Sequence, residues 1–172
     1  MSTILAPEAF TTRSGVELLV RPTIQFDEKA LTRFFDKVTD EDRRFRFLAA
    51  SDHVRHDQLR PLVEVDHLHT ESFLAFETSD GTLVATGQLA CDAALDTAEV
   101  AVSVRADYRG RGVGWTILDL LAREAEKRGV RRVISIESRD NHAAIELECE
   151  KGFTAEPFEG DPTLVLLSKT FR

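Results

Sequence analysis

The amino-acid sequence predicts one domain of the α/β (α+β) class, organised around a strand–loop–helix unit at residues 98–128. A run of mainly apolar and small residues from Glu99 to Val104 indicates a strand, and a polar, glycine-rich loop follows it. Strands and helices are mixed along the rest of the chain, and no internal repeat or low-complexity linker divides it, which favours a single domain. Beyond the loop, apolar or small residues recur at the helical spacing of one buried face: Gly114, Ile117, Leu118, Leu121, Ala122 and Ala125.

Before this unit, the chain predicts a lead-in, a strand, two or three helices and a hairpin. Residues 1–14 are expected to be a loose lead-in, and residues 15–172 to form the domain. Asp80-Gly81 is a strong hairpin signal. The predicted elements are a strand at 16–21, a helix that Asp27 caps and that ends near Lys37, a helix after Asp40 that reaches Leu48, a helix at 55–67 that Pro61 kinks or begins, and strands at 72–77 and 83–91.

From the central strand onward, the pattern alternates between strands and helices. Gly129 is a natural stop for the central helix, and Asn141 has the side chain that an N-cap requires. The predicted elements are a strand at 97–104, a helix at 112–128, a strand at 132–137, a helix from Asn141 to about Lys151, and strands at 153–155 and 163–168.

The composition limits the class of protein and its compartment. The 172 residues, of which 42% are hydrophobic and 30% charged, suffice for one sizeable core. No apolar run approaches the roughly 20 residues of a membrane helix, and the N-terminus does not resemble a signal peptide. Two cysteines, and five histidines without ligand spacing, predict no disulfide framework and no metal site. A formal charge of −8 argues against nucleic-acid binding. The two cysteines are expected to be free thiols in a reducing cytoplasm, so we expect a cytoplasmic protein without a nucleic-acid or membrane partner.

The loop Arg109-Gly110-Arg111-Gly112-Val113-Gly114 has the features of a phosphate-binding site. The first turn of a helix leaves N–H groups unpaired and carries roughly half a positive charge. Glycines let a phosphate approach the backbone closely, and the two arginines add cationic donors. The alternative that the residues leave open is a glycine-rich turn with two solvated arginines.

Two known phosphate-binding motifs fit this loop poorly. A P-loop needs Lys-Ser or Lys-Thr after its last glycine, where this chain has Trp115-Thr116. A dinucleotide-binding fold has the spacing G-x-G-x-x-G near a domain start, with an acidic residue about 20 residues later at a strand end. Glu137 lies at such a strand end, but the glycines at 110, 112 and 114 have a different spacing and lie far from the chain start.

Two motifs together resemble the GNAT superfamily of acyl-CoA-dependent N-acyltransferases. Arg109-x-x-Gly112-x-Gly114, after a strand that ends at Val104, is similar to the signature Q/R-x-x-G-x-G/A of that superfamily. A downstream segment is similar to its N-x-x-A-x-x-L…GF pattern, with Asn141-x-x-Ala144-Ile145-x-Leu147 and then Lys151-Gly152-Phe153.

The order of elements also resembles the GNAT fold over nearly the whole chain. This resemblance implies a mixed, mostly antiparallel sheet of six to seven strands with helices on both faces. Residues 31–48 and 98–104 are further similar to the bacterial protein-lysine acetyltransferases that act on acyl-CoA synthetases.

The resemblance implies that acetyl-CoA is the acyl donor and a primary amine the acceptor. It favours a protein lysine, for example on an acyl-CoA synthetase; small-molecule amines and a non-catalytic acyl-CoA sensor are the alternatives. Val102 and Val104 are expected to lie beside the pantetheine, where their strand separates from residues 132–136, with an amide near Val104 toward the thioester oxygen. Asn141 is expected to hydrogen-bond the pantetheine arm and to cap its helix. The N–H groups expected to hold the diphosphate belong to Arg109, Gly110, Arg111, Gly112, Val113, Gly114 and Trp115.

Glu99 is the candidate general base. The resemblance implies this role, because the protein-lysine acetyltransferases carry a catalytic glutamate ten residues before the position of Arg109. The strand period gives an independent argument, since Glu99 shares one face with Ala101 and Ser103, whose small side chains leave room for a substrate. The alternative is a solvated carboxylate or an ion-pair partner of an arginine.

The general acid is not evident from the sequence. Many GNAT enzymes have a tyrosine after N-x-x-A-x-x-L, where this chain has Glu148, and Tyr108 is expected to pack rather than react. The cluster Arg43-Arg44-x-Arg46 is expected to contact the 3′-phosphate of CoA or an acidic substrate, or to be a solvated helix face.

Overall fold

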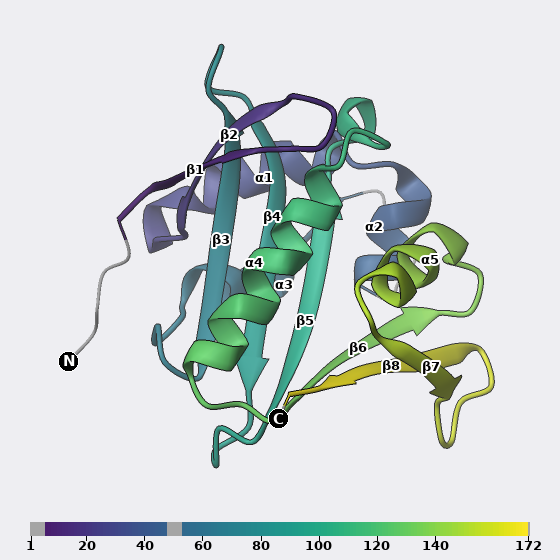
Figure 1. The fold of residues 1–172 in the computed structure, drawn as a ribbon. Coiled ribbons are helices and arrows are strands. Elements are labelled where there is room, and N and C mark those ends of the chain that lie inside the picture. The colour runs from purple at the N-terminus through teal and green to yellow at the C-terminus, as the bar shows by residue number, and fades with distance from the viewer. Residues whose placement is uncertain (1–5, 48–52, 172) are drawn as a thin grey trace.

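The computed structural model describes residues 6–47 and 53–171, which form an eight-stranded sheet with helices on both faces (Figure 1). The strand order is β1-β2-β3-β4-β5-β6-β8-β7. In this sheet β5 and β6 are parallel and the other neighbours are antiparallel, as predicted. The strands are β1 Glu8–Thr11, β2 Glu17–Pro22, β3 Thr70–Glu77, β4 Leu83–Cys91, β5 Thr97–Val104, β6 Arg132–Ser138, β7 Thr154–Pro157 and β8 Leu164–Thr170.

Five α-helices and two 3-10 turns connect the strands within the described residues. The helices are α1 Glu28–Asp36, α2 Asp40–Phe47, α3 His56–Val63, α4 Val113–Lys127 and α5 His142–Glu150, and the 3-10 turns are η1 Gln25–Asp27 and η2 Ala106–Tyr108. None of the helices in this part of the chain has the length and apolar character needed to cross a membrane.

The eighth strand corrects the prediction of six to seven strands. It is β1, which lies within residues 1–14, the segment predicted as a loose lead-in. It pairs with β2 from Glu8↔Val20 to Thr11↔Glu17, and the turn between them passes through Gly15 at a φ of 91°. β1 is a short edge strand whose side chains are mostly exposed, so it lacks the hydrophobic alternation by which strands are recognised in a sequence.

The predicted helices begin near the expected residues, but two of the caps differ. Asp27 stands at the N-cap position of α1 without a side-chain capping hydrogen bond. The Thr39 hydroxyl accepts a hydrogen bond from the Asp42 N–H and caps α2, while Asp40 pairs with Arg43 instead. The predicted end of this helix, Leu48, lies outside the described residues. α3 begins before Pro61 and includes it, so the proline does not mark the start.

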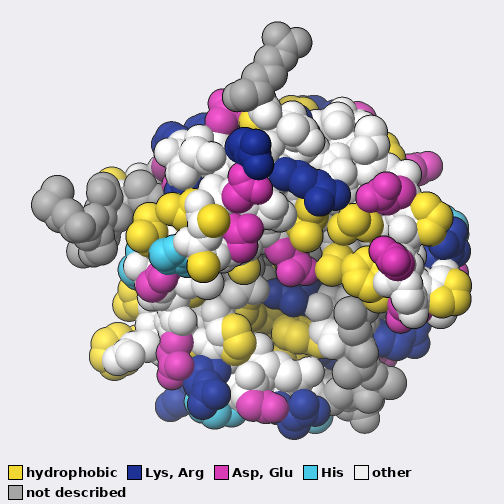
Figure 2. All heavy atoms as spheres, turned by 90° about the horizontal axis from the view of Figure 1, so that it is seen from below, with side chains coloured by type: hydrophobic (Ala, Val, Ile, Leu, Met, Phe, Trp, Pro, Cys, Tyr) yellow, Lys and Arg dark blue, Asp and Glu magenta, His cyan; other side chains and the backbone are white. Residues whose placement is uncertain are grey.

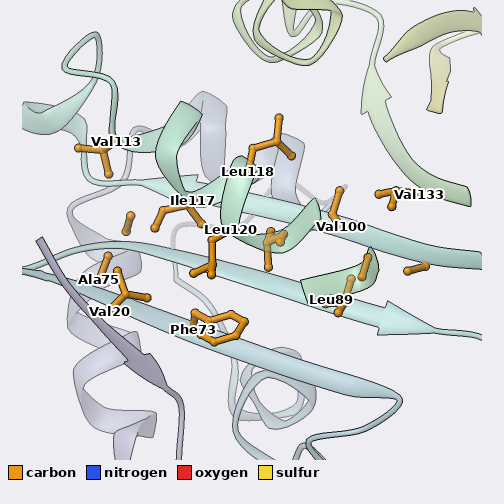
Figure 3. Packing of buried hydrophobic residues seen from close by; sticks show 14 of the residues in the cluster. Val20, Phe73, Ala75, Leu89, Val100, Val113, Ile117, Leu118, Leu120 and Val133 are labelled. Carbon is orange, nitrogen blue, oxygen red and sulfur yellow. The ribbon is translucent and has the colours of Figure 1, made fainter. Parts of the chain in front are cut away.

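Alternate residues of the sheet supply two hydrophobic cores, one on each face. Figure 3 shows Ile117 and Leu120 of α4 pointing toward Phe73 and Ala75 of β3. The next residue of that strand, Leu74, packs on the opposite face with the cluster from α1 and α3. This division follows from the two-residue period of strands, and it confirms the helices on both faces.

The central helix α4 follows its predicted amphipathic pattern and lies very close to the sheet. The exposed positions Asp119, Arg123, Glu126 and Lys127 are those of the predicted polar face. At Gly87 of β4 a Cβ atom would lie 2.6 Å from Cγ2 of Ile117, so α4 approaches to a distance that only glycine permits. This contact fixes the height of the helix, and therefore of its N-terminus, above β5.

Candidate active site

The strands β5 and β6 separate partway along their length. They pair over three residues, from Thr97↔Arg132 to Glu99↔Ile134, and then part. The other edge of β5 stays paired with β4 as far as Ala85↔Val104. Figure 1 shows β6 diverging from β5 toward α5. The predicted separation of these strands is therefore confirmed.

The separation leaves backbone groups of β5 facing open space. The Arg105 N–H donates to the Val84 carbonyl of β4. Since backbone groups of successive residues point to opposite edges, the N–H groups of Val102 and Val104 face the side on which β6 has departed. The free edge can therefore accept a ligand that pairs with the strand backbone.

The loop after β5 presents a row of unpaired N–H groups. From Gly110 to Trp115, these groups donate no hydrogen bond to any group in the described part of the chain. Gly112 is the N-cap of α4 at a φ of 80°, and Gly110 also has a positive φ, of 73°. A Cβ atom at Gly114 would touch Val104 and Leu147 at 3.5 Å each, so a side chain there would fill the space beside the helix N-terminus. This arrangement fits a diphosphate, because N–H groups and the positive end of the helix dipole converge there.

A pocket of about 460 Å³ connects this loop to Glu99. Its walls come from α2, β5, the loop, the start of α4, β6 and α5. Of the residues predicted for the site, Arg111 is the exception: its guanidinium stacks 4.7 Å from the Tyr108 ring centroid, outside this pocket. The predicted residues that line the pocket are Glu99, Val102, Val104, Arg109, Gly110, Gly112, Val113, Gly114, Trp115 and Asn141.

The loop end of the pocket is more cationic than predicted. Arg13, from the supposed lead-in, lines it and lies 4.7 Å from the Trp115 ring centroid, while Lys151 lies 3.5 Å from the same ring. Arg109 also lines it, with Nε 3.3 Å from a carboxylate oxygen of Asp42. No sequence motif includes Arg13. Its place in the site follows only from the structure, in which the turn after β1 lies beside the loop.

The arginine cluster of α2 divides between the core and the pocket. Arg43 is buried and donates to the carbonyls of Phe35 and Val38 at 3.0 and 3.3 Å, so it is neither a solvated residue nor a phosphate ligand. Arg46 reaches the pocket, where its Nη2 donates to Gln88 Oε1 at 2.9 Å. Burial lowers the pKa of Arg46, and the opposing charges of Glu99 and Glu137 raise it in part. The sequence prediction for this cluster did not include a position in the pocket near Glu99 and Glu137, which Arg46 occupies.

Glu99 is an exposed carboxylate at the end of the paired part of β5. It lines the pocket together with Ala101 and Ser103, which share its face of the strand as predicted. Its position next to the free edge of β5 brings it into the same hollow as the loop, although ten residues separate it from Arg109.

Two further carboxyl groups line the wall opposite β5. Glu137 of β6 accepts hydrogen bonds from the Ser135 hydroxyl at 2.9 Å and the Asn141 side-chain amide at 3.3 Å. Glu148 of α5 is 4% exposed, and neither of its oxygens has a hydrogen-bond partner among the described residues. Burial, and then the charge of Glu137, raises the pKa of Glu148 to about 9, and burial also raises the pKa of Glu137. The pair therefore holds at least one proton near neutral pH.

Two predicted polar residues have clear structural partners. The Asn141 side chain accepts a hydrogen bond from the Ala144 N–H at 3.4 Å, which confirms it as the N-cap of α5. Its contact with pantetheine remains a prediction. Tyr108 is buried and its hydroxyl donates to Glu77, so it packs as predicted.

The charge of the surface is mixed rather than uniform. Figure 2 shows acidic and basic side chains interspersed among the described residues of one face. The cationic side chains around the pocket are therefore a local feature of an acidic protein, whose formal charge is −8.

The fold and the pocket agree with the comparison to known families. Residues 24–153 match the Acetyltransferase (GNAT) family, and the chain belongs to this family. It is therefore an acyltransferase enzyme that transfers an acyl group from acyl-CoA to an amine, and proteins of the family use acetyl-CoA as donor.

Individual relatives cover most of the chain. It is 28% identical over 154 residues to Acetyltransferase PA5475 of Pseudomonas aeruginosa. This alignment covers 88% of this chain and 83% of that protein. It is similar to the GNAT domain of S. lividans PAT, with 25% identity, a TM-score of 0.87, and coverage of 96% and 97% of the two chains. It also shares its fold with a cAMP-binding acyltransferase from Mycobacterium smegmatis, at 23% identity and a TM-score of 0.64, covering 97% of this chain and 48% of the other.

Proposed function

We propose that this protein transfers the acetyl group of acetyl-CoA to the side-chain amine of a protein lysine. The observation that carries the proposal is a single pocket that runs from the unpaired N–H groups of the loop, along the free edge of β5, to Glu99. The N–H groups of the loop suit a diphosphate, and the free edge of β5 suits the amides of a pantetheine arm. Glu99 suits the reacting amine.

The residues fit a CoA donor along the whole pocket. The N–H groups from Gly110 to Trp115 would hold the diphosphate, and Arg13 and Arg109 would add positive charge. The backbone of Val102 and Val104 would pair with the pantetheine amides, much as an added strand pairs with a sheet edge.

The chemistry assigned to this chain is base catalysis combined with polarisation of the thioester. Glu99 would accept a proton from the attacking ammonium, directly or through water. An N–H group of the free β5 edge, at or near Val104, would donate to the thioester oxygen as negative charge develops there. Because the strand is held by β4 on its other edge, this donor is oriented before the substrate binds.

Two observations support a protein lysine as the acceptor. Residues 31–48 and 98–104 resemble the bacterial protein-lysine acetyltransferases, and the fold is similar to the GNAT domain of S. lividans PAT at 25% identity. On the wall near Glu99, α2 carries Phe45 and Arg46 into the pocket, and we place the acceptor there. A small-molecule amine is the other acceptor class for this pocket.

The first test is calorimetric titration with acetyl-CoA, CoA, ATP and NAD, each alone. We expect micromolar binding of acetyl-CoA and CoA, and no response to ATP or NAD. Acetyl transfer is then measured by mass spectrometry on an acyl-CoA synthetase, with spermidine as the small-amine comparison. Acetylation of a synthetase lysine supports the proposal; acetylation of spermidine alone overturns the protein acceptor, and folded protein that binds no acetyl-CoA overturns the donor site.

A further inference from the structure

Glu148 of α5 is a buried acid for which the reaction above has no use. It is 4% exposed and lines the pocket between the parted strands. Neither of its carboxyl oxygens makes a hydrogen bond of normal geometry to a described residue, although Glu137 and Ser135 lie close enough to affect its pKa. Buried polar groups without a partner are uncommon in folded proteins, so this side chain calls for an explanation.

A contribution to stability explains Glu148 poorly. Removing a carboxyl group from water without a partner is unfavourable, and an apolar side chain of similar volume would fill the same space at less cost. The adjacent acid is treated differently, because Glu137 accepts hydrogen bonds from both Ser135 and Asn141. Asn141 donates to Glu137 and not to Glu148, so negative charge is held more easily on Glu137 and the proton on Glu148.

The charged groups around Glu148 come from several elements. Glu137 of β6 acts on it directly, and Arg46 of α2 offsets part of the charge of Glu137. Glu99 of β5 lines the same pocket. Glu146, on the same helix as Glu148, is exposed. The other charged residues that line the pocket are Arg13, Asp42 and Arg109, toward its loop end.

An acid in this part of the pocket would assist acetyl transfer. When the C–S bond of the thioester breaks, its electron pair stays on sulfur and forms a thiolate inside the pocket. A thiolate in apolar surroundings is a poor leaving group, and a neutral carboxylic acid beside it can supply the proton. Such an acid must line the pocket and be protonated at working pH, and Glu148 meets both conditions.

We propose that Glu148 is the general acid that protonates the CoA sulfur as it leaves, and that Glu137 is a positioning residue that keeps this proton on Glu148. The proposal rests on the proposed function. The amine nitrogen forms a bond to the thioester carbon, and the C–S bond breaks. The ammonium loses one proton to Glu99 before the nitrogen attacks, and the nitrogen loses a second proton to solvent as the amide forms. The proton of Glu148 moves to sulfur, Glu99 then releases its proton to solvent, and Glu148 regains a proton from solvent. The sum is an ammonium ion and a thioester giving an amide, a thiol and one proton.

The test compares E148Q, which cannot donate a proton as an acid, with E146Q, an exposed change on the same helix. For E148Q we expect kcat to fall by about 10²–10³-fold, with the Kd for acetyl-CoA within about twofold of the wild-type value. Wild-type kcat should decline as the pH rises through about 9, and this decline should be absent from E148Q. E146Q should match the wild type in each measurement.

A spectroscopic readout does not require an acceptor or a folded E148Q variant. Side-chain carboxyl ¹³C resonances of labelled wild-type protein should include a glutamate that titrates far above the ordinary range, and this signal should move when CoA binds. In E137Q the same resonance should titrate at lower pH, because the charge that holds its proton is gone.

The two proposals fail in different ways. Unchanged kcat and an unchanged high-pH decline in E148Q overturn the acid role while leaving the acetyltransferase function intact. A Glu148 resonance that titrates in the ordinary range with CoA bound overturns it as well. Wild-type protein that binds no acetyl-CoA and acetylates no amine overturns the proposed function, and the acid role with it.

Discussion

The two edges of β5 meet opposite environments. Toward β4 the strand is paired along its length, from Cys91↔Ala98 to Ala85↔Val104. Toward β6 it pairs over three residues and then borders a pocket. The paired side has an apolar core under α4, whereas the parted side contains Arg46, Glu137 and Glu148. The comparison teaches that one edge holds the strand in place so that the other can offer its backbone to a ligand.

The largest effect is expected on the parted side, at Glu99. Replacing Glu99 with Gln removes the proton acceptor at nearly constant volume, so kcat should fall by about 10²–10⁴-fold while the Kd for acetyl-CoA changes little. Glu126→Gln on the exposed face of α4 is the control. Full activity in E99Q would show that Glu99 is a solvated carboxylate without a catalytic role.

The buried acid of the parted side should make stability depend on pH. The raised pKa of Glu148 lies above its ordinary value of 4.5, so the folded protein keeps a proton that the unfolded chain releases. This contribution is fully present below about pH 4.5 and is lost as the pH rises toward about 9. Relative to E148Q, wild-type stability should decrease between pH 5 and pH 9 by on the order of a few kcal/mol.

Thermal unfolding of both proteins at pH 5, 7 and 9 measures this difference. E146Q, whose carboxyl is exposed, should follow the wild type at each pH. A gap in Tm between wild type and E148Q that stays constant across the three pH values contradicts a protonated Glu148.

On the paired side, a change should affect stability and leave chemistry alone. Gly87→Ala places a Cβ atom 2.6 Å from Ile117 and should cost about 1–3 kcal/mol as α4 is pushed from the sheet. In a domain of this size, Tm falls by roughly 2–4 °C per kcal/mol. The Kd for acetyl-CoA, measured on the folded fraction, should shift less than the stability does. Loss of binding without loss of stability would contradict the division between the two sides.

The smallest effect compares the two ends of α4. Gly112 and Gly129 both have a φ of 80°, so alanine at either position should cost about 1 kcal/mol of backbone strain. Gly112 lies in the loop with free N–H groups and Gly129 at the other end of the helix. G112A should therefore weaken acetyl-CoA binding by about tenfold through a distorted loop, whereas G129A should not. Equal affinities in the two variants would argue against the loop as the diphosphate site.

Local patterns predicted most of the elements and one side of the site. The central strand, the amphipathic face of α4 and the Asp80-Gly81 hairpin follow from two-residue and 3.6-residue periods and from turn chemistry, which neighbouring residues determine. The short edge strand β1 was missed because its side chains are mostly exposed. Arg46 and Arg43 look alike in the sequence, and only their places on α2 separate a pocket residue from a buried cap of α1.

By itself, the sequence determined the order of the elements, the glycine-rich start of α4 and the placement of Glu99 on the small-residue face of its strand. These depend on the spacing of nearby residues, where the geometry of the chain is nearly fixed. The tertiary structure decided where β5 and β6 part, which brings Glu137 and Glu148 together in the pocket. Their protonation depends on burial and on each other's charge, and both arise only when distant segments pack around one pocket.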